Sequence, residues 1–237
     1  MTKRAFLHAL LGAACLLAAA ALPGRAAIVF DDHFDGDSGG VPEGWWIGHG
    51  LEEDVVEAGT IVTLYDWVSI HSASALDPSS GTVTMLTQID GTQPDGQPHA
   101  GLSNHETFSR SGLLLRAEDG EIVMHAADTE GGPQVYTVGL VGGYAGGPIL
   151  VTLILEAAAF RVLTDAPAFD SGWVDYSSAF PTFTREDLGS AVHVYLMDDV
   201  APEQPGRSAF DRVTVDVDPS TPAERASFGR IKALYRD

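Results

Sequence analysis

Residues 212–217 read Arg-Val-Thr-Val-Asp-Val, so polar and apolar side chains alternate at every position. Residues 192–196, Val-His-Val-Tyr-Leu, alternate in the same way. Successive side chains of a β-strand point to opposite faces of its sheet, so each segment predicts a strand with one buried and one polar face. This pattern is typical of antiparallel sheets that cover a core on one side.

Short apolar runs of this kind recur along the chain between clusters of Gly, Pro, Asp and Ser. A helix is the alternative for residues 149–163, but the β-branched residues and the preceding Gly-Gly-Pro favour a strand. The polar stretch from Asp90 to Ser111 predicts a long loop that is either functional or mobile. We predict strands near residues 28–34, 60–71, 82–89, 112–118, 121–127, 134–141, 148–156, 159–164, 191–198 and 209–217.

The N-terminus has the pattern of a secretory signal. Lys3 and Arg4 precede an apolar run over residues 6–22, and small residues follow at 23–27. The run is shorter than the roughly 20 apolar residues needed to span a bilayer, so we expect cleavage rather than membrane insertion. The mature protein is therefore expected to be secreted, periplasmic or displayed on the cell surface. Cys15 is the only cysteine and lies in the signal, so no disulfide is expected.

The charge balance is strongly acidic, with 13 Lys and Arg against 33 Asp and Glu and a net charge of −20. Such a field repels nucleic acids and anionic membranes, so neither is an expected partner. The excess of carboxylates either keeps the protein soluble, in a salty environment for example, or attracts a specific cation.

The last segment differs from the rest. Residues 221–224, Thr-Pro-Ala-Glu, fit a helix capping box with Pro at the first helical position. Phe228, Ile231, Leu234 and Tyr235 then recur at helical spacing. The pattern predicts a short amphipathic helix that either docks on the acidic body or serves as a handle for a partner.

Both ends of the predicted β-region carry family motifs. Residues 28–37, Ile-Val-Phe-Asp-Asp-His-Phe-Asp-Gly-Asp, with Pro-Glu-Gly-Trp at 42–45, resemble the first strand of secreted concanavalin A-like (LamG-like) domains and carbohydrate-binding modules. Residues 209–215, Ala-Phe-Asp-Arg-Val-Thr-Val, resemble their last strand. The resemblance implies an all-β, two-sheet antiparallel jelly-roll sandwich in which the first and last strands pair. The expected organisation is a signal peptide at 1–26, the β-sandwich at 27–218 and a short C-terminal helix at 219–237.

The same resemblance implies an extracellular, non-catalytic binding or structural module. Carbohydrate is the first ligand class to test, with a polysaccharide or a cell-surface glycan as partner. A glycoside hydrolase or lyase on the same fold is one alternative. A structural surface protein that binds other proteins is another, because fold alone does not determine function.

A structural calcium commonly joins the first and last strands of the resembled carbohydrate-binding modules. The matching positions are Asp32 or Asp35 together with Asp211, since calcium prefers several oxygen ligands. The alternative is that these carboxylates are solvated turn residues of an acidic protein.

Residues 52–57, Glu-Glu-Asp-Val-Val-Glu, match the E-x-D-x-x-E motif of laminarinase-type hydrolases of this fold group. By that resemblance Glu52 would be the nucleophile, Asp54 a helper and Glu57 the general acid, all on one strand face. Glu53 fills a position that is normally apolar, and the motif lies unusually early in the chain. No catalytic residue is therefore favoured.

Aromatic side chains are the natural sugar platforms, yet in β-proteins they also pack in cores, so the ligand-binding residues stay unassigned. The histidines lack the spacing of a zinc site, and His99 is expected in the long polar loop. The aromatic candidates are Trp45, Trp46, Trp67, Trp173, Tyr65, Tyr144 and Tyr176.

Overall fold

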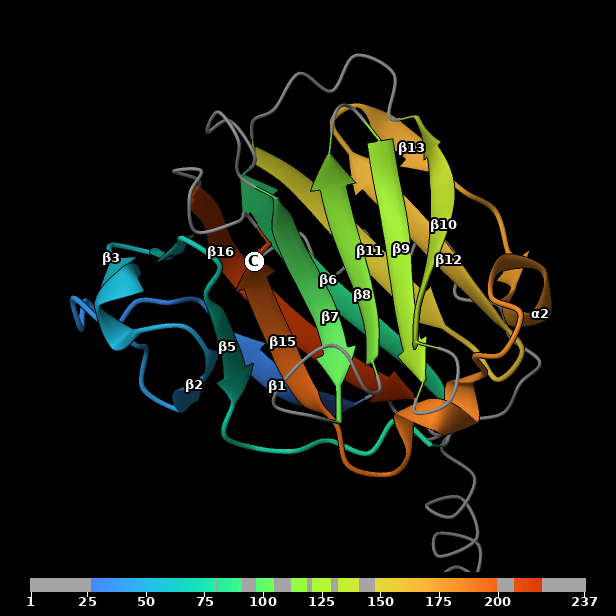
Figure 1. Ribbon diagram of the computed structural model, residues 1–237, viewed down its shortest axis with the longest axis horizontal. Helices are drawn as coiled ribbons and strands as arrows, with labels where there is room; N and C mark the ends of the chain where they lie inside the picture. Colours follow the sequence, from blue (N-terminus) through green and yellow to red (C-terminus); the bar gives the residue numbers. More distant parts are fainter. Residues whose placement is uncertain are drawn as a thin grey trace, which may run out of the picture.

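The computed structural model contains two antiparallel β-sheets packed face to face (Figure 1). The predicted all-β, two-sheet antiparallel sandwich is confirmed, and its arrangement is that of a jelly roll. The predicted signal peptide and the predicted C-terminal helix lie outside the described residues. Among the described residues, no helix combines the length and hydropathy needed to cross a membrane. The structure describes residues 27–79, 81–90, 97–104, 112–118, 121–128, 132–140, 148–199 and 207–218.

The first sheet, sheet A, lies behind the second in Figure 1. In spatial order its main path is β13 (Ala168–Asp170), β12 (Ala159–Asp165), β11 (Pro148–Leu155), β6 (Thr82–Asp90), β16 (Arg207–Asp218), β4 (Ile61–Tyr65) and β3 (Val55–Ala58). Two further strands join this path: β1 (Ala27–Asp32) pairs with β16, and β14 (Val174–Asp175) pairs with β12.

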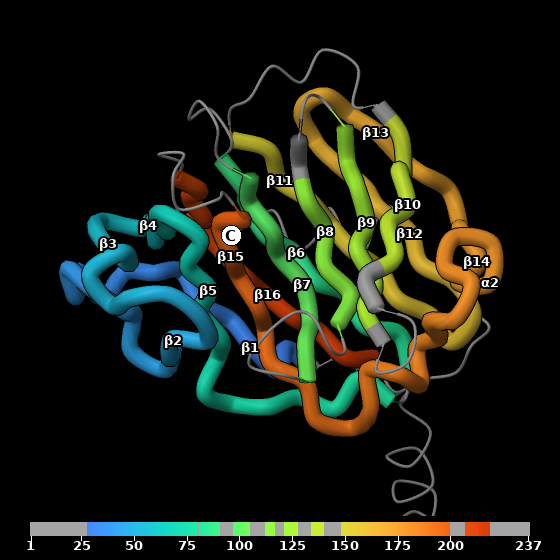
Figure 2. Tube along the Cα trace, in the orientation of Figure 1, coloured from blue at the N-terminus to red at the C-terminus, as the bar shows by residue number. Residues whose placement is uncertain are grey.

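Sheet B faces the viewer in Figure 1, and the tube in Figure 2 shows the same two layers. Its order is β10 (Gly132–Leu140), β9 (Glu121–Asp128), β8 (Gly112–Glu118), β7 (Pro98–Ser103), β15 (His193–Asp198), β5 (Ser69–Ser72) and β2 (Trp45–His49). Short helical turns are η1 (Glu52–Asp54), α2 (Tyr176–Ala179) and η2 (Arg185–Leu188).

The last described strand, β16, lies in the interior of sheet A. One edge of β16 pairs with β6, while its other edge pairs first with β4 and then, beyond an irregularity between Phe210 and Val213, with β1. Phe30 lies opposite Val215, and Asp32 lies opposite Val213. The predicted pairing of the first and last strands is therefore confirmed.

The core fills the space between the sheets. Val213 and Val215 of sheet A and Val194 and Leu196 of sheet B belong to one buried apolar cluster, as their alternation predicts. The segment 148–155 is a strand with neighbours on both sides, which confirms the strand over the helix. Each predicted strand except 60–71 is confirmed to within two residues at either end.

The predicted strand 60–71 is wrong, because the segment forms two strands, β4 and β5, in different sheets. The chain reverses at Asp66 and Trp67, whose φ angles are +53° and +67°. Neither residue type gives a strong sequence signal for this left-handed conformation, which favours glycine. The short strands β2 and β3 also lie outside the predicted set.

The predicted long loop from Asp90 to Ser111 is also wrong in part, since it contains β7, which lies between β15 and β8. Pro98 and Gly101 hide this strand in the sequence, because both residue types are depleted in strands. A Cβ at Gly101 would lie 2.2 Å from the carbonyl oxygen of Leu113 and 2.8 Å from the Cα of Leu114. Glycine is therefore needed here for close approach of β7 and β8.

We predict that Gly101→Ala lowers the free energy of unfolding by about 1–3 kcal/mol, because the backbone of β8 must move. Gly40→Ala is the matched control, since a Cβ there meets no atom within 4 Å. Chemical denaturation of both variants measures the difference. Equal stability of the two variants would contradict the close approach.

Candidate functional site

The outer face of sheet B carries the most distinctive set of side chains. Inward-pointing residues of its strands belong to the core, so their alternating neighbours point away from it. Strand register aligns these outward residues in two rows across the sheet, which we call the histidine face. The first row is Trp46, His71, Tyr195, Gly101, Leu114, His125 and Val135, and the second is Ser69, Met197, His99, Arg116, Val123 and Thr137.

Rings stack along one end of the first row. The Trp46 and His71 rings are nearly parallel, with centroids 4.6 Å apart, and Tyr195 meets His71 edge-on at 4.5 Å. His193 adds an edge contact to Trp46 at 6.2 Å and places its Nδ1 2.6 Å from the Ser72 carbonyl oxygen. His71 is fully buried. The cluster therefore holds the half-buried Trp46 ring in a fixed orientation.

A histidine pair lies further along the face. The His99 and His125 rings meet edge-on with centroids 5.1 Å apart, and Arg116 is opposite His99 in the ladder. Burial, together with repulsion from His125 and Arg116, lowers the pKa of His99 well below its usual value. Burial and Arg116 lower the pKa of His125 to about 4. Both imidazoles are therefore neutral at neutral pH.

His99 corrects a prediction made from the sequence. It was expected in a surface loop, but it lies on β7 and is buried. The burial of this face extends to Leu114, Tyr195 and Met197, which form an apolar cluster separate from the main core. The face is thus an ordered surface rather than a set of solvated side chains.

Trp67 lies next to this face, in the turn that leads into β5. Its side chain is 39% exposed, and its ring meets that of His49 at 4.6 Å. Its φ of +67° is a conformation that bulky residues rarely adopt and that clusters at functional sites. An exposed indole is thereby held beside β2, the edge strand that carries Trp46.

The remaining aromatic candidates have other roles. Trp45 is buried in the core and donates from Nε1 to Asp32 at 2.7 Å, and Tyr176 is also a core residue. Trp173 packs against a small apolar cluster with the Arg161 guanidinium 5.8 Å from its ring. Tyr65 is half-buried on β4 of sheet A, and Tyr144 lies outside the described residues.

Neither row of the histidine face, in the described strands of sheet B, contains an Asp or Glu. Carboxylate residues lie at its margins: Asp199 Oδ2 is 4.0 Å from His99 Nε2, and Glu118 is opposite Glu121 in the ladder, two residues beyond Arg116 and Val123. Retaining glycoside hydrolysis uses two carboxyl groups roughly 5 Å apart, and inverting hydrolysis also uses two. Of the other polar and aromatic groups in these rows, Trp46 and Arg116 are half-buried, whereas Tyr195 and the histidines are buried.

The E-x-D-x-x-E residues lie elsewhere. Glu52 and Asp54 belong to the turn η1, whereas Glu57 is on β3 at the edge of sheet A, so the three do not share one strand. Glu57 is 3% exposed and accepts hydrogen bonds from the backbone N–H groups of Gly36 and Ser38, at 3.4 and 3.0 Å. These contacts fasten the loop after β1 to sheet A.

Two of the three predicted calcium ligands, Asp32 and Asp211, already accept hydrogen bonds from protein groups. Asp32 accepts from the Phe34 backbone N–H at 2.8 Å and from Trp45 Nε1, and Asp211 accepts from Gln88 Nε2 at 3.0 Å. Asp35 is exposed. The described part of the chain contains no group of three or more His, Cys, Asp or Glu side chains suited to a metal ion. We derive no role for calcium from this arrangement.

The fold is a jelly-roll sandwich of the concanavalin A-like type, as the sequence motifs at both ends predict. Searches of protein-family models and of curated protein sequences find no match. Solved structures with this fold include a glycosyl hydrolase family protein from Mycobacterium fortuitum, at a TM-score of 0.57 and 15% identity over 80% of this chain and 99% of that one.

Two further structures have TM-scores of 0.56. One is a glycosyl hydrolase family 16 protein from Mycobacterium smegmatis, 16% identical over 80% of this chain and 100% of that one. The other is described as an immunostimulatory antigen and pseudo beta-1,3-glucanase of Mycobacterium tuberculosis, 15% identical over 80% of this chain and 98% of that one. At these identities the comparisons establish the fold.

We predict that Glu57→Ala lowers the free energy of unfolding by about 1–3 kcal/mol, because two backbone N–H groups lose their acceptor. Glu53→Ala, at an exposed position of the same motif, should change it by less than about 0.5 kcal/mol. Denaturant unfolding compares the variants. If Glu57→Ala is as stable as the Glu53 variant, the fastening role is wrong.

The histidine pair predicts a loss of stability in acid. The unfolded chain binds a proton at His125 near pH 6.5, whereas the folded protein binds it only near pH 4. Stability therefore falls as the pH decreases from 6.5 to about 4, and His99 acts in the same direction. Burial raises the pKa of Asp198, which opposes this loss near the acid end.

His125→Gln should reduce the acid-induced fall in Tm between pH 7 and pH 4.5 by on the order of 5 °C. Thr137→Ala, an exposed substitution in the same sheet without a titrating group, is the control. Thermal unfolding followed by circular dichroism measures both. Identical pH profiles for the wild type and the His125 variant would refute the neutral buried imidazole.

Proposed function

We propose that the protein is an exported, non-catalytic carbohydrate-binding protein, and that a polysaccharide binds at Trp67 and at the accessible residues of the histidine face, which are Trp46, Arg116, Val135 and Thr137. One observation carries the proposal: an exposed indole, Trp67, is held in a left-handed turn beside the half-buried Trp46 ring at one edge of the histidine face. The signal-like N-terminus supports export to a compartment where extracellular glycans occur.

Aromatic rings suit sugars because one face of a pyranose ring is largely apolar, while its rim carries hydroxyl groups. Trp67 and Trp46 supply apolar surfaces on one side of the face. Arg116, whose Nη1 already donates to Gln97 Oε1 at 3.3 Å, adds a polar group further along. A few polar groups among apolar and aromatic ones are the usual composition of a small-molecule site.

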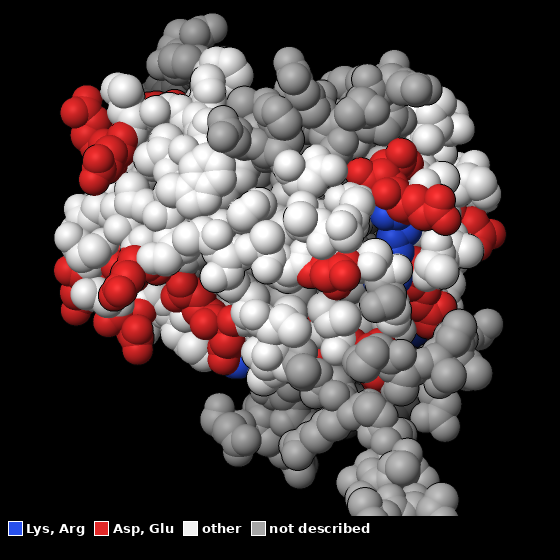
Figure 3. Space-filling view, turned by 90° about the horizontal axis from the view of Figure 1, so that it is seen from below, with Lys and Arg blue, Asp and Glu red and all other residues white. Residues whose placement is uncertain are grey.

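The charge of the protein favours a neutral polysaccharide. The net charge is −20, and Figure 3 shows acidic side chains spread over the underside with few basic ones among them. Such a field repels polyanions, so polyuronates and sulfated glycans are disfavoured on a long contact surface. The neighbour described as a pseudo beta-1,3-glucanase makes a β-1,3-glucan the first probe.

Trp67→Ala should weaken binding of laminarin, a soluble β-1,3-glucan, by about tenfold, which corresponds to about 1.4 kcal/mol. Ile61→Ala is the matched control, because Ile61 is similarly exposed but lies on sheet A. Affinity electrophoresis and titration calorimetry report the affinities.

The same laminarin samples are assayed for reducing ends and for unsaturated products. We expect neither, since no pair of carboxylates lies within the two rows of the histidine face. Turnover that depends on the protein would instead favour the glycoside hydrolase or lyase alternative. Equal affinities of the Trp67 variant, the Ile61 variant and the wild type would remove Trp67 from the binding surface.

A further inference from the structure

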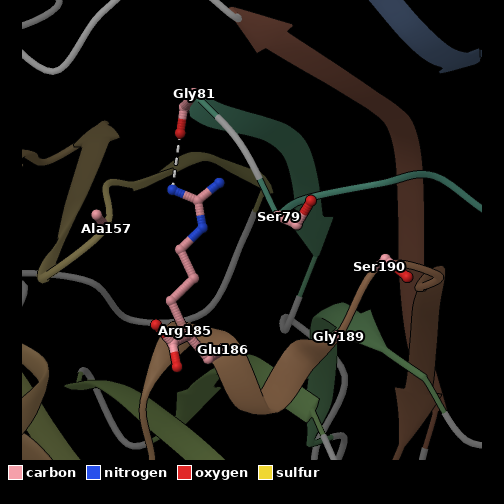
Figure 4. A pocket seen from close by; sticks show the side chains of 7 residues that line it. All are labelled: Ser79, Gly81, Ala157, Arg185, Glu186, Gly189 and Ser190. Atoms are coloured by element: carbon pink, nitrogen blue, oxygen red, sulfur yellow. Dashed lines mark hydrogen bonds between the residues drawn. The ribbon is translucent and has the colours of Figure 1, made fainter.

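A cavity of about 370 Å³ lies at one end of the sandwich, away from the histidine face. It is formed by η2 and the residues after it, by the segment before β6 and by the turn between β11 and β12. Figure 4 shows the Arg185 side chain extending from η2 toward Gly81, with Ser79 and Ser190 to one side of it and Ala157 to the other. The volume is at the lower end of small-molecule sites, roughly 300–1,000 Å³.

Arg185 is a buried cation whose partners are all neutral. The side chain is 6% exposed. Its Nη1 donates to the carbonyl oxygens of Gly81 and Leu155, at 2.8 and 3.2 Å, and its Nη2 donates to that of Pro78. Its Nε–H has no hydrogen-bond partner within the described structure.

No carboxylate of the described residues lies within ion-pair distance of this guanidinium. Asp77 and Glu156 act on it only as more distant charges, and burial lowers the pKa of Arg185 despite them. A buried cation is unfavourable unless an anion compensates it. The cavity beside Arg185 is a place where such an anion fits.

The rest of the lining favours a hydroxylated molecule. Ser79 and Ser190 carry hydroxyl groups that can donate or accept, and the exposed Glu186 carboxylate accepts from hydroxyl donors. Glu186 also repels anions, and repels those of higher charge more strongly, which disfavours dicarboxylates and phosphates relative to a monocarboxylate. A molecule with one carboxylate and several hydroxyl groups, on a ring or an open chain, matches both Arg185 and the polar residues opposite it.

We propose that this cavity binds a small hydroxylated monocarboxylate, such as a sugar acid, with its carboxylate toward Arg185 and its hydroxyl groups toward Ser79, Ser190 and Glu186. The proposal does not depend on the glycan-binding role of the histidine face. The neutral polysaccharide and the small anion occupy separate surfaces. The protein would therefore bind both at once.

Titration calorimetry with glucuronate tests the proposal, with glucose and acetate as partial ligands. The experiment is run near 0.15 M salt, where a Debye length of about 8 Å screens the net negative charge. We expect glucuronate to bind at least about tenfold more tightly than either partial ligand. Binding of glucose at equal strength would refute the need for the carboxylate, and equal binding of acetate would refute the need for the hydroxyl groups.

Ala157→Phe places a ring in the cavity and should abolish glucuronate binding. Ala158→Phe is the matched control, because Ala158 is an exposed neighbour in the same turn that does not line the cavity. Both substitutions are at exposed positions, so folding is not at risk. Glucuronate binding that survives in the Ala157 variant, or none in the wild type up to about 10 mM, overturns the proposal.

Arg185→Lys and Arg185→Gln separate charge from packing. Lys keeps the positive charge and should retain part of the glucuronate affinity, whereas Gln should lose at least about tenfold. Thermal unfolding of both variants is measured in parallel, because Arg185 also holds three backbone carbonyls. Equal glucuronate affinity in folded Lys and Gln variants would contradict the role of the charge.

Discussion

The pairing of β16 with three other strands is the constraint on which the sandwich depends. β16 contacts β6 along one edge and both β4 and β1 along the other, so the last described strand joins segments from the beginning and the middle of the chain. These contacts span long sequence separations and cost much chain entropy, which the buried faces of both sheets must offset. The domain has no disulfide to share this cost, since its single cysteine lies in the predicted signal.

Sheet A provides the apolar face against which sheet B packs. The inward residues of β7, β8, β9 and β15 pack against it, and this packing fixes the register of their outward neighbours. Gly101 allows β7 and β8 to approach closely. The residues on either side of it in the row, Tyr195 and Leu114, are both buried. Uncharged imidazoles are compatible with this burial, because their low pKa values avoid the cost of a buried cation.

Much of the fold could be predicted from the sequence, because period-two alternation and turn residues mark most strands. Both ends of the domain also carry motifs that fix which strands pair. The split at Asp66 and Trp67 could not be predicted, because two left-handed non-glycine residues interrupt an otherwise continuous apolar run. The strand β7 could not be predicted either, because Pro98 and Gly101 are residue types that are depleted in strands. The neighbouring strands stabilise it.

The histidine face could not be predicted for a different reason. Its members come from strands between β2 and β10, and only their register brings Trp46, His71 and Tyr195 into one row. Sequence spacing among histidines therefore carries no information about their contacts. The acidic motif at 52–57 shows the converse, because residues with a family spacing can belong to a turn and an edge strand.

Solved structures with the same fold include a glycosyl hydrolase family 16 protein. The fold alone does not determine activity, because the side chains on its surface decide the chemistry. Hydrolysis of a glycosidic bond requires a proton donor and a second carboxyl group held across the bond. The neutral imidazoles of the histidine face, which pack against Arg116 and aromatic rings, meet neither requirement. Rigid aromatic surfaces favour affinity because little side-chain entropy is lost on binding. The proposed binding role therefore depends on the accessible rings of Trp67 and Trp46, which their histidine neighbours hold in place.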